Sequence, residues 1–313
     1  MATPTTRTAL SARDVVFGFG AHSVIGDMPV LLQMAQLADR ERLDLFSLSD
    51  HPYIGQRLDA YATVGFVVGR TQHLAGFANV SNLPTRPPAM LARTVTTLSA
   101  LSEGRVVLGM GAGGLWERIA DMGVEPLTPA QAVEAFEEAI VLVRKLSGGG
   151  PPVTFKGRHY HVEQIEPAPV AAPPVWTGSV GPKSLAATGR VADGWIPGHA
   201  ADWLSARYRA SRPVVDEAAR SAGRDPREVR TVFNFPGQIT ERPLARTRDG
   251  DGRWIGGSVE QWTEELTAAV VEHGASGFML FSPRGGTPDL TSLGHWAGEI
   301  APAVREAVAR HAG

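Results

Sequence analysis

Asp50 and His51 place a carboxylate next to an imidazole, and only Ser49 separates them from the apolar run 43–48. An imidazole titrates near neutral pH, so it can give or take a proton during a reaction. In a barrel of parallel strands, side chains at the carboxyl ends of the strands line the active site. Aspartate and Pro52 also favour turns, so the segment is equally consistent with an ordinary turn. His51 is the candidate catalytic residue, with Asp50 beside it.

A glycine-rich segment, GMGAGG at 109–114, follows another apolar run and contains the spacing G-x-G-x-x-G. In a dinucleotide-binding domain such glycines let backbone amides approach a pyrophosphate. Three strand–helix units precede this segment, and no second strand ends in an acidic residue roughly 20 residues later, which argues against that domain. The alternative is a strand-to-loop turn in which Gly111, Ala112 and Gly113 give steric room for a flat group.

A third segment, GSVGPKS at 178–184, lies between an expected strand and an expected helix. Free backbone amides at a helix N-terminus attract anions, and Lys183 adds a positive charge. The segment lacks the spacing of a nucleoside-triphosphate loop. These features favour a phosphate site formed by Val180, Gly181, Lys183 and Ser184 over an ordinary loop.

Two further groups of polar residues follow apolar segments or fall on an expected hairpin. Asn79, Ser81 and Asn82 follow the apolar run that begins at Leu74, where they either bind the polar edge of a ring or end the strand. His159 and His161 have the spacing of a metal pair, but they fall on one face of an expected solvated hairpin. We therefore expect no metal site.

Composition limits the classes of function. The 313 residues are 43% hydrophobic and carry a net charge of −2, which suits a large folded core and argues against nucleic-acid binding. The sequence has no cysteine, so thiolate nucleophiles and cysteine metal sites are excluded. Residues 1–14 lack the apolar core of a signal peptide, and no apolar run reaches 18 residues. We expect a cytoplasmic protein that does not enter a membrane.

Short apolar runs alternate with amphipathic segments along the whole chain. The expected strands are Val15–Gly20, Leu43–Leu48, Leu74–Val80, Val106–Met110, Pro174–Thr177, Gly194–Ile196, Thr231–Phe235 and Gly277–Phe281. The expected helices are Pro29–Arg42, Asp59–Gly69, Pro88–Leu101, one beginning at Pro129, Lys183–Val191, Trp203–Ser221, Val259–His273 and Leu293–Arg310. Thr128 with Gln131 and Ser258 with Gln261 form capping boxes.

Eight strand–helix alternations predict an α/β fold, a single (β/α)8 barrel over residues 1–313. A small hairpin, Val153–Val162, is inserted after the fourth strand–helix unit, and 241–257 is expected to be a long mobile loop. The alternative is a doubly wound sheet in two halves joined near 148–152, because alternation alone does not separate the two.

Taken together, these segments resemble the luciferase-like monooxygenase superfamily of flavin-dependent barrels. The resemblance rests on the order and spacing of five blocks: LDLFSLSDHP (43–52), NLPTRPPAMLA (82–92), LSALSEGRVVLGMGAG (98–113), VWTGSVGPKSLAATGRVADGW (175–195) and residues 253–281. It implies a cofactor, FMN or the deazaflavin F420, at the carboxyl-terminal end of the barrel.

The resemblance also implies roles for individual residues. His51 would lie beside the reactive carbon of the ring, and Asp50 would bind the hydroxyl edge. A non-proline cis peptide near Ala78–Asn79 would back the ring, with Ser81 nearby. Gly111, Ala112 and Gly113 would line the ring or side chain, and Val180, Gly181, Lys183 and Ser184 would bind the phosphate.

One departure concerns the substrate. Sugar-phosphate dehydrogenases of this family carry a glutamate just after the glycines, where this sequence has Gly114. That difference makes glucose 6-phosphate a doubtful substrate and leaves the small-molecule substrate open.

The Ser-Asp-His strand end, the arginine-rich composition and the chain length favour F420 hydride transfer. The alternatives are an FMN-dependent monooxygenase, with reduced cofactor supplied by a separate reductase, and a flavin-binding barrel without turnover. The resemblance, together with the apolar segment 59–69, predicts a homodimer.

Overall fold

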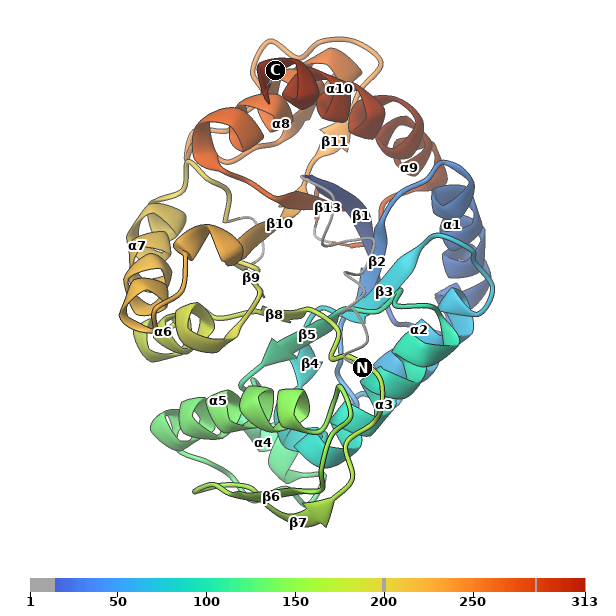
Figure 1. Ribbon diagram of the computed structural model, residues 1–313. Coiled ribbons are helices and arrows are strands. Elements are labelled where there is room, and N and C mark those ends of the chain that lie inside the picture. Colours follow the sequence, from blue (N-terminus) through green and yellow to red (C-terminus); the bar gives the residue numbers. More distant parts are fainter. Residues whose placement is uncertain (1–14, 199–200, 285, 313) are drawn as a thin grey trace.

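The chain folds into a barrel of parallel strands surrounded by helices (Figure 1). The computed structural model describes residues 15–198, 201–284 and 286–312. The strands follow the order β3-β2-β1-β13-β10-β9-β8-β5-β4. Their bounds are β1 Val16–Ala21, β2 Leu45–Leu48, β3 Ala75–Ala78, β4 Ser81–Asn82, β5 Leu108–Gly111, β8 Val175–Thr177, β9 Gly194–Trp195, β10 Arg230–Pro236 and β13 Gly277–Phe281.

The third expected strand is split into two pieces, and this split closes the barrel. β3 pairs with β2, whereas β4 pairs with β5. Between them the peptide bond Asn79–Val80 is cis, one bond beyond the position Ala78–Asn79. With β3 and β4 taken as one strand, the structure has the eight expected strand positions. The barrel prediction is confirmed, and the doubly wound alternative is wrong.

Helices surround the barrel and follow the expected segments closely. Their bounds are α1 Met28–Arg40, α2 Ala60–Val68, α3 Pro88–Leu101, α5 Pro129–Lys145, α6 Pro182–Val191, α7 Ala206–Ser221 and α8 Val259–His273. Both capping boxes are present. The expected C-terminal helix is divided into α9 (Leu290–His295), a π-helical turn (Trp296–Ile300) and α10 (Ala301–Ala312). Among the described residues, none of the helices combines the length and the apolar character that crossing a membrane requires.

Two apolar layers hold the barrel together. The inner cluster fills the lumen and includes Leu45, Phe77, Trp176, Val232 and Met279. The outer cluster packs the helices against the strands. Because the lumen is filled by large side chains, the opening for a ligand is restricted to the carboxyl ends of the strands, which we call the mouth.

Two connections between the strands and helices of the barrel carry additional elements. The antiparallel pair β6 (Val153–Lys156) and β7 (His161–Ile165) lies outside the ring of helices, beside α5 (Figure 1). The Glu138 carboxylate of α5 accepts backbone hydrogen bonds from the turn at 158–160. A short helix, α4 (Trp116–Ala120), follows β5 and was not expected from the sequence.

The loop at 241–257, which is expected to be mobile, makes hydrogen bonds to neighbouring parts of the barrel. The Arg248 guanidinium donates to Asp202 at 2.6 Å and also bonds to Glu265 of α8. The end of the loop forms β12 (Gly256–Gly257), which pairs with β11 (Gln238–Ile239). A charged, glycine-rich composition favours a loop, but it does not show which charges find partners.

Candidate active site

His51 lies at the mouth, in the loop that follows β2. Its Nδ1 atom is 2.7 Å from the Tyr53 hydroxyl oxygen. Nearby, the Arg57 guanidinium donates to the hydroxyls of Ser49 and Ser23, which links the ends of β2 and β1. Burial, followed by the positive charge of Arg57, lowers the pKa of His51 below its usual 6.5, against an opposing effect of Asp50. The imidazole is therefore neutral at pH 7.

Asp50 points away from the neighbouring imidazole and binds an arginine. Its side chain is only 1% exposed, and it accepts two hydrogen bonds of 2.6 Å from Arg86 and one of 2.9 Å from the Asn82 backbone. Arg86 also binds Asp59, the N-cap of α2. Although burial opposes it, the hydrogen bonds and charges of the two carboxylates raise the pKa of Arg86. Asp50 thus anchors the loop after β4, and its contact with a cofactor stays a prediction.

Polar side chains cover the apolar filling of the lumen. The Asn79 amide donates to Asn234 Oδ1 at 2.9 Å and to Ser47 Oγ at 3.2 Å. These three residues come from β10, β2 and the break between β3 and β4, so the hydrogen bonds span the barrel. They form a polar floor at the level where the strands end.

Ser81 lies behind this floor and is fully buried. Its hydroxyl donates to the Gly109 carbonyl at 2.6 Å, and the Tyr61 hydroxyl lies 2.6 Å from its oxygen. Ser81 of β4 therefore links its strand to Gly109, next to β5, and to α2. Its predicted contact with a cofactor remains untested.

Packing explains the glycines of 109–113. A methyl group at Gly109 would lie 2.0 Å from the Ala78 carbonyl oxygen, and one at Gly111 would lie 2.7 Å from Val80 Cγ2. Gly113 has a φ of +104° and contacts Pro84. These glycines are therefore required by packing against Ala78, Val80 and Pro84, and the room for a flat group stays a prediction. Val80 also packs against Gly178. Its side chain therefore lies between two glycines, Gly111 at the end of β5 and Gly178 directly after β8.

The N-terminus of α6 is open. Gly181 is its N-cap and provides no side-chain hydrogen bond to the first turn, so the amides of Lys183 and Ser184 lack that partner. Ser184 Oγ donates to the Gly181 carbonyl at 3.0 Å, and Val180 is 59% exposed. A methyl group built on Gly198 would lie 3.4 Å from an Arg207 guanidinium nitrogen and 3.8 Å from Val180 Cγ1. A positive side chain therefore lies close to this terminus.

Four residues of this region are not evident from the sequence alone: Tyr53, Arg57, Arg86 and Asn234. Arg86 and Asn234 meet their partners across 36 and 155 residues of chain, which a pattern of local spacing does not reveal. The sequence gives one indication that Asn234 has a special position, because this polar residue interrupts the apolar strand VFNFP (232–236).

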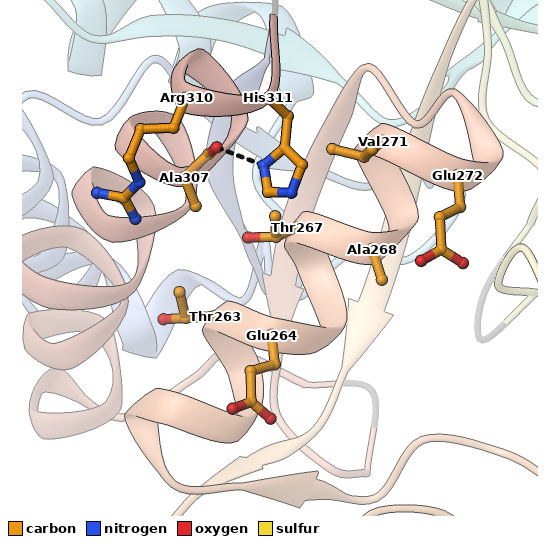
Figure 2. Close-up of a pocket in the computed structure, with 9 residues that line it drawn as sticks. All are labelled: Thr263, Glu264, Thr267, Ala268, Val271, Glu272, Ala307, Arg310 and His311. Atoms are coloured by element: carbon orange, nitrogen blue, oxygen red, sulfur yellow. Dashed lines mark hydrogen bonds between the residues drawn. The ribbon is translucent and has the colours of Figure 1, made fainter.

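A separate hollow lies on the outside of the barrel, between α8 and α10, and has a volume of about 400 Å³. Figure 2 shows Thr263 and Thr267 on the side of α8 that faces Arg310 and His311 of α10, whereas Glu264 points away from them. The Nδ1 atom of His311 lies 2.8 Å from the Ala307 carbonyl oxygen of its own helix. None of the lining residues belongs to the mouth, so this hollow is not part of the candidate active site.

Comparison with known proteins identifies the family. Residues 16–277 match the family model for luciferase-like monooxygenases, and the chain belongs to this family. A solved structure of the coenzyme F420-dependent tetrahydromethanopterin reductase from Methanopyrus kandleri superposes with a TM-score of 0.75. It is 16% identical and covers 92% of this chain and 99% of that one.

Two curated relatives are more similar in sequence. The F420-dependent glucose-6-phosphate dehydrogenase of Microbacterium testaceum (strain StLB037) is 29% identical over 225 residues, which are 69% of this chain and 66% of that protein. The phthiodiolone/phenolphthiodiolone dimycocerosates ketoreductase of Mycobacterium bovis (strain BCG / Pasteur 1173P2) is 30% identical over 246 residues, which are 76% of this chain and 62% of that protein. The chain thus spans less than two thirds of the length of these relatives.

Proposed function

We propose that the protein is an F420-dependent oxidoreductase that transfers hydride between the deazaflavin and a small organic substrate, an alcohol or the corresponding carbonyl compound. The observation that carries the proposal is the position of a neutral imidazole, His51, at the mouth of a barrel of this family. A neutral imidazole can exchange a proton with a substrate oxygen as hydride moves at the adjoining carbon.

The residues at the mouth fit a flat cofactor with a phosphate. Val80 packs against the inner apolar cluster and lies between Gly111 and Gly178, where it offers an apolar surface, and Asn79 precedes it in the chain. The open N-terminus of α6, with Arg207 nearby, offers amides and a positive charge to a phosphate. In this arrangement Val80 and Gly111–Gly113 would face the ring, and Val180–Ser184 would hold the phosphate. The bound deazaflavin supplies the hydride; the protein orients the substrate and excludes water.

The relatives support F420 and an alcohol or carbonyl substrate, because one is named a dehydrogenase with this cofactor and the other a ketoreductase. Gly114 stands where sugar-phosphate dehydrogenases of the family carry glutamate, and a side chain placed there would meet open space. We therefore infer a substrate other than glucose 6-phosphate. Direct binding is measured by titrating the purified chain with F420 and, in parallel, with FMN.

Binding of F420 without binding of FMN, followed by cofactor-dependent turnover of an alcohol or ketone, is the expected result. Binding of FMN alone would overturn this proposal and favour an FMN-dependent monooxygenase that receives reduced FMN from a separate reductase. Binding of F420 without turnover of any alcohol or ketone in a broad panel would favour a barrel that only carries the cofactor.

A further inference from the structure

Tyr53 contacts the candidate catalytic residue directly and has no part in the function proposed above. Its hydroxyl oxygen is 2.7 Å from His51 Nδ1, and both side chains are partly buried at the mouth. The rings are 5.6 Å apart between centroids and are tilted by 56°, so the contact is made by the hydroxyl rather than by stacking.

The direction of this hydrogen bond follows from the chemistry of the two groups. Burial, followed by the charge of Asp50, raises the pKa of Tyr53, against lowering effects of Asn82 and Arg118, so the phenol keeps its proton at neutral pH. A phenol is a far stronger acid than a neutral imidazole N–H, and the imidazole nitrogen is the stronger base. The favourable arrangement therefore has the Tyr53 hydroxyl donating to Nδ1.

We propose that Tyr53 is a positioning residue that fixes His51 in the tautomer with its proton on Nε2 and relays a proton through it. The hydrogen bond made by one ring nitrogen decides which nitrogen carries the proton. With Nδ1 accepting from Tyr53, Nε2–H remains to donate to a substrate oxygen. This inference rests on the proposed function for its substrate, but the hydrogen-bonded pair itself does not depend on it.

The proton and electron balance is complete for reduction of a carbonyl. As hydride from the reduced cofactor reaches the carbonyl carbon, the C=O π bond breaks, and the oxygen takes the proton from His51 Nε2. The Tyr53 proton moves to Nδ1, so the imidazole stays neutral. The phenolate left on Tyr53 is stabilised by Arg118 and Asn82, against the opposing charge of Asp50. The starting tautomer returns when water protonates Nε2 and Nδ1 gives its proton back to Tyr53. Oxidation of an alcohol follows the same steps in reverse.

The pair is tested first without cofactor or substrate. Long-range ¹H–¹⁵N spectra of the full chain resolve the imidazole nitrogens, and His51→Gln assigns the His51 signals. We expect Nε2 protonated and Nδ1 accepting a hydrogen bond in the wild type, and a shift of the Nδ1 resonance in Tyr53→Phe. The matched control is Tyr160→Phe, which changes a tyrosine just before β7 on the outer hairpin and should leave His51 unchanged. A proton on Nδ1 in the wild type, or an unmoved Nδ1 resonance in Tyr53→Phe, would overturn the proposal.

Kinetics then test the relay. Tyr53→Phe should lower kcat about 10- to 100-fold, less than removal of the imidazole, with KM and cofactor affinity little changed. Adding Tyr53→Phe to His51→Ala should cause no further loss, because Tyr53 acts through His51. Additive losses would contradict the relay. If F420 does not bind at all, the proposed function fails, while the nitrogen spectra still decide the pair.

Discussion

At the scale of single residues, His51 is the side chain whose loss should affect chemistry most. We expect His51→Ala to lower turnover about 10²–10⁴-fold, the range typical of a general acid or base, and to change cofactor affinity much less. Steady-state kinetics and a cofactor titration measure the two quantities separately. His22→Ala is the matched control, because His22 directly follows β1 at the same mouth. Turnover equal to that of the wild type in His51→Ala would leave His51 a packing residue.

Asp50 should have a different signature, because it holds the buried end of an ion pair with Arg86. Removing one partner of a buried pair leaves the other charge without compensation. In Asp50→Ala, Arg86 still forms its ion pair with Asp59. We therefore expect the free energy of unfolding to fall by about 3 kcal/mol, the lower end of the range for breaking a buried ion pair. Cofactor affinity should fall with it, since the same carboxylate fixes the loop at Asn82.

Urea unfolding and cofactor titration measure both effects of Asp50→Ala. Asp59→Ala is the control, and it should cost about 1 kcal/mol, as loss of an exposed helix N-cap usually does. An unchanged free energy of unfolding in Asp50→Ala would contradict the anchoring role. A loss of cofactor affinity alone would instead favour the direct ring contact that the family resemblance implies.

At the scale of secondary-structure elements, the N-terminus of α6 should bind the cofactor phosphate. Gly181 has an extended backbone that any residue adopts, and a methyl group there would make an ordinary 3.7 Å contact with Ser184 Oγ. Gly181→Ala should therefore fold normally and serve as the control. We expect Gly181→Leu to raise the dissociation constant of the cofactor by about tenfold or more, because its side chain would cover the free amides. Unchanged binding in Gly181→Leu would remove this terminus from the phosphate site.

Elements of this fold are predictable from the sequence where their signals are local. The capping boxes at Thr128 and Ser258 mark the starts of α5 and α8 correctly, because each box lies within four residues. The break between β3 and β4 was expected only through the family resemblance, and it lies one bond later. The split of the last helix at its π-helical turn has no signal that we recognised.

The candidate site is less predictable than the elements. His51 and Asp50 stand out because a charged residue and an imidazole end an apolar run. Their partners do not, since Arg86 reaches Asp50 from a loop 36 residues away. Tyr53 is only two residues from His51, but the conformation of a turn decides whether such neighbours meet.

At the scale of the whole molecule, the single-domain organisation of residues 1–313 and the homodimer both stay predictions. α2 exposes less apolar surface for an interface than its sequence suggests. Four of its apolar side chains are buried within the chain: Tyr61, Val64, Val67 and Val68. Phe66 remains 42% exposed, with the Arg70 guanidinium 4.6 Å from its ring centre. The neighbouring helix α3 adds exposed apolar side chains at Met90 (62%) and Leu101 (80%).

Phe66, Met90 and Leu101 together suit an interface between two copies, because large exposed apolar side chains on adjoining helices mark such surfaces. The two helices pack closely, since a methyl group at Gly65 of α2 would lie 3.0 Å from Leu98 of α3. We expect light scattering at micromolar protein to give the mass of a dimer, and Phe66→Glu to shift it towards a monomer. Loss of a buried aromatic contact typically costs about 2 kcal/mol or more, which raises the dissociation constant roughly 30-fold. Val271→Glu, on the exposed face of α8, is the control and should keep the wild-type mass. A monomeric wild type would reject the dimer, and an unchanged mass in Phe66→Glu would place its interface elsewhere.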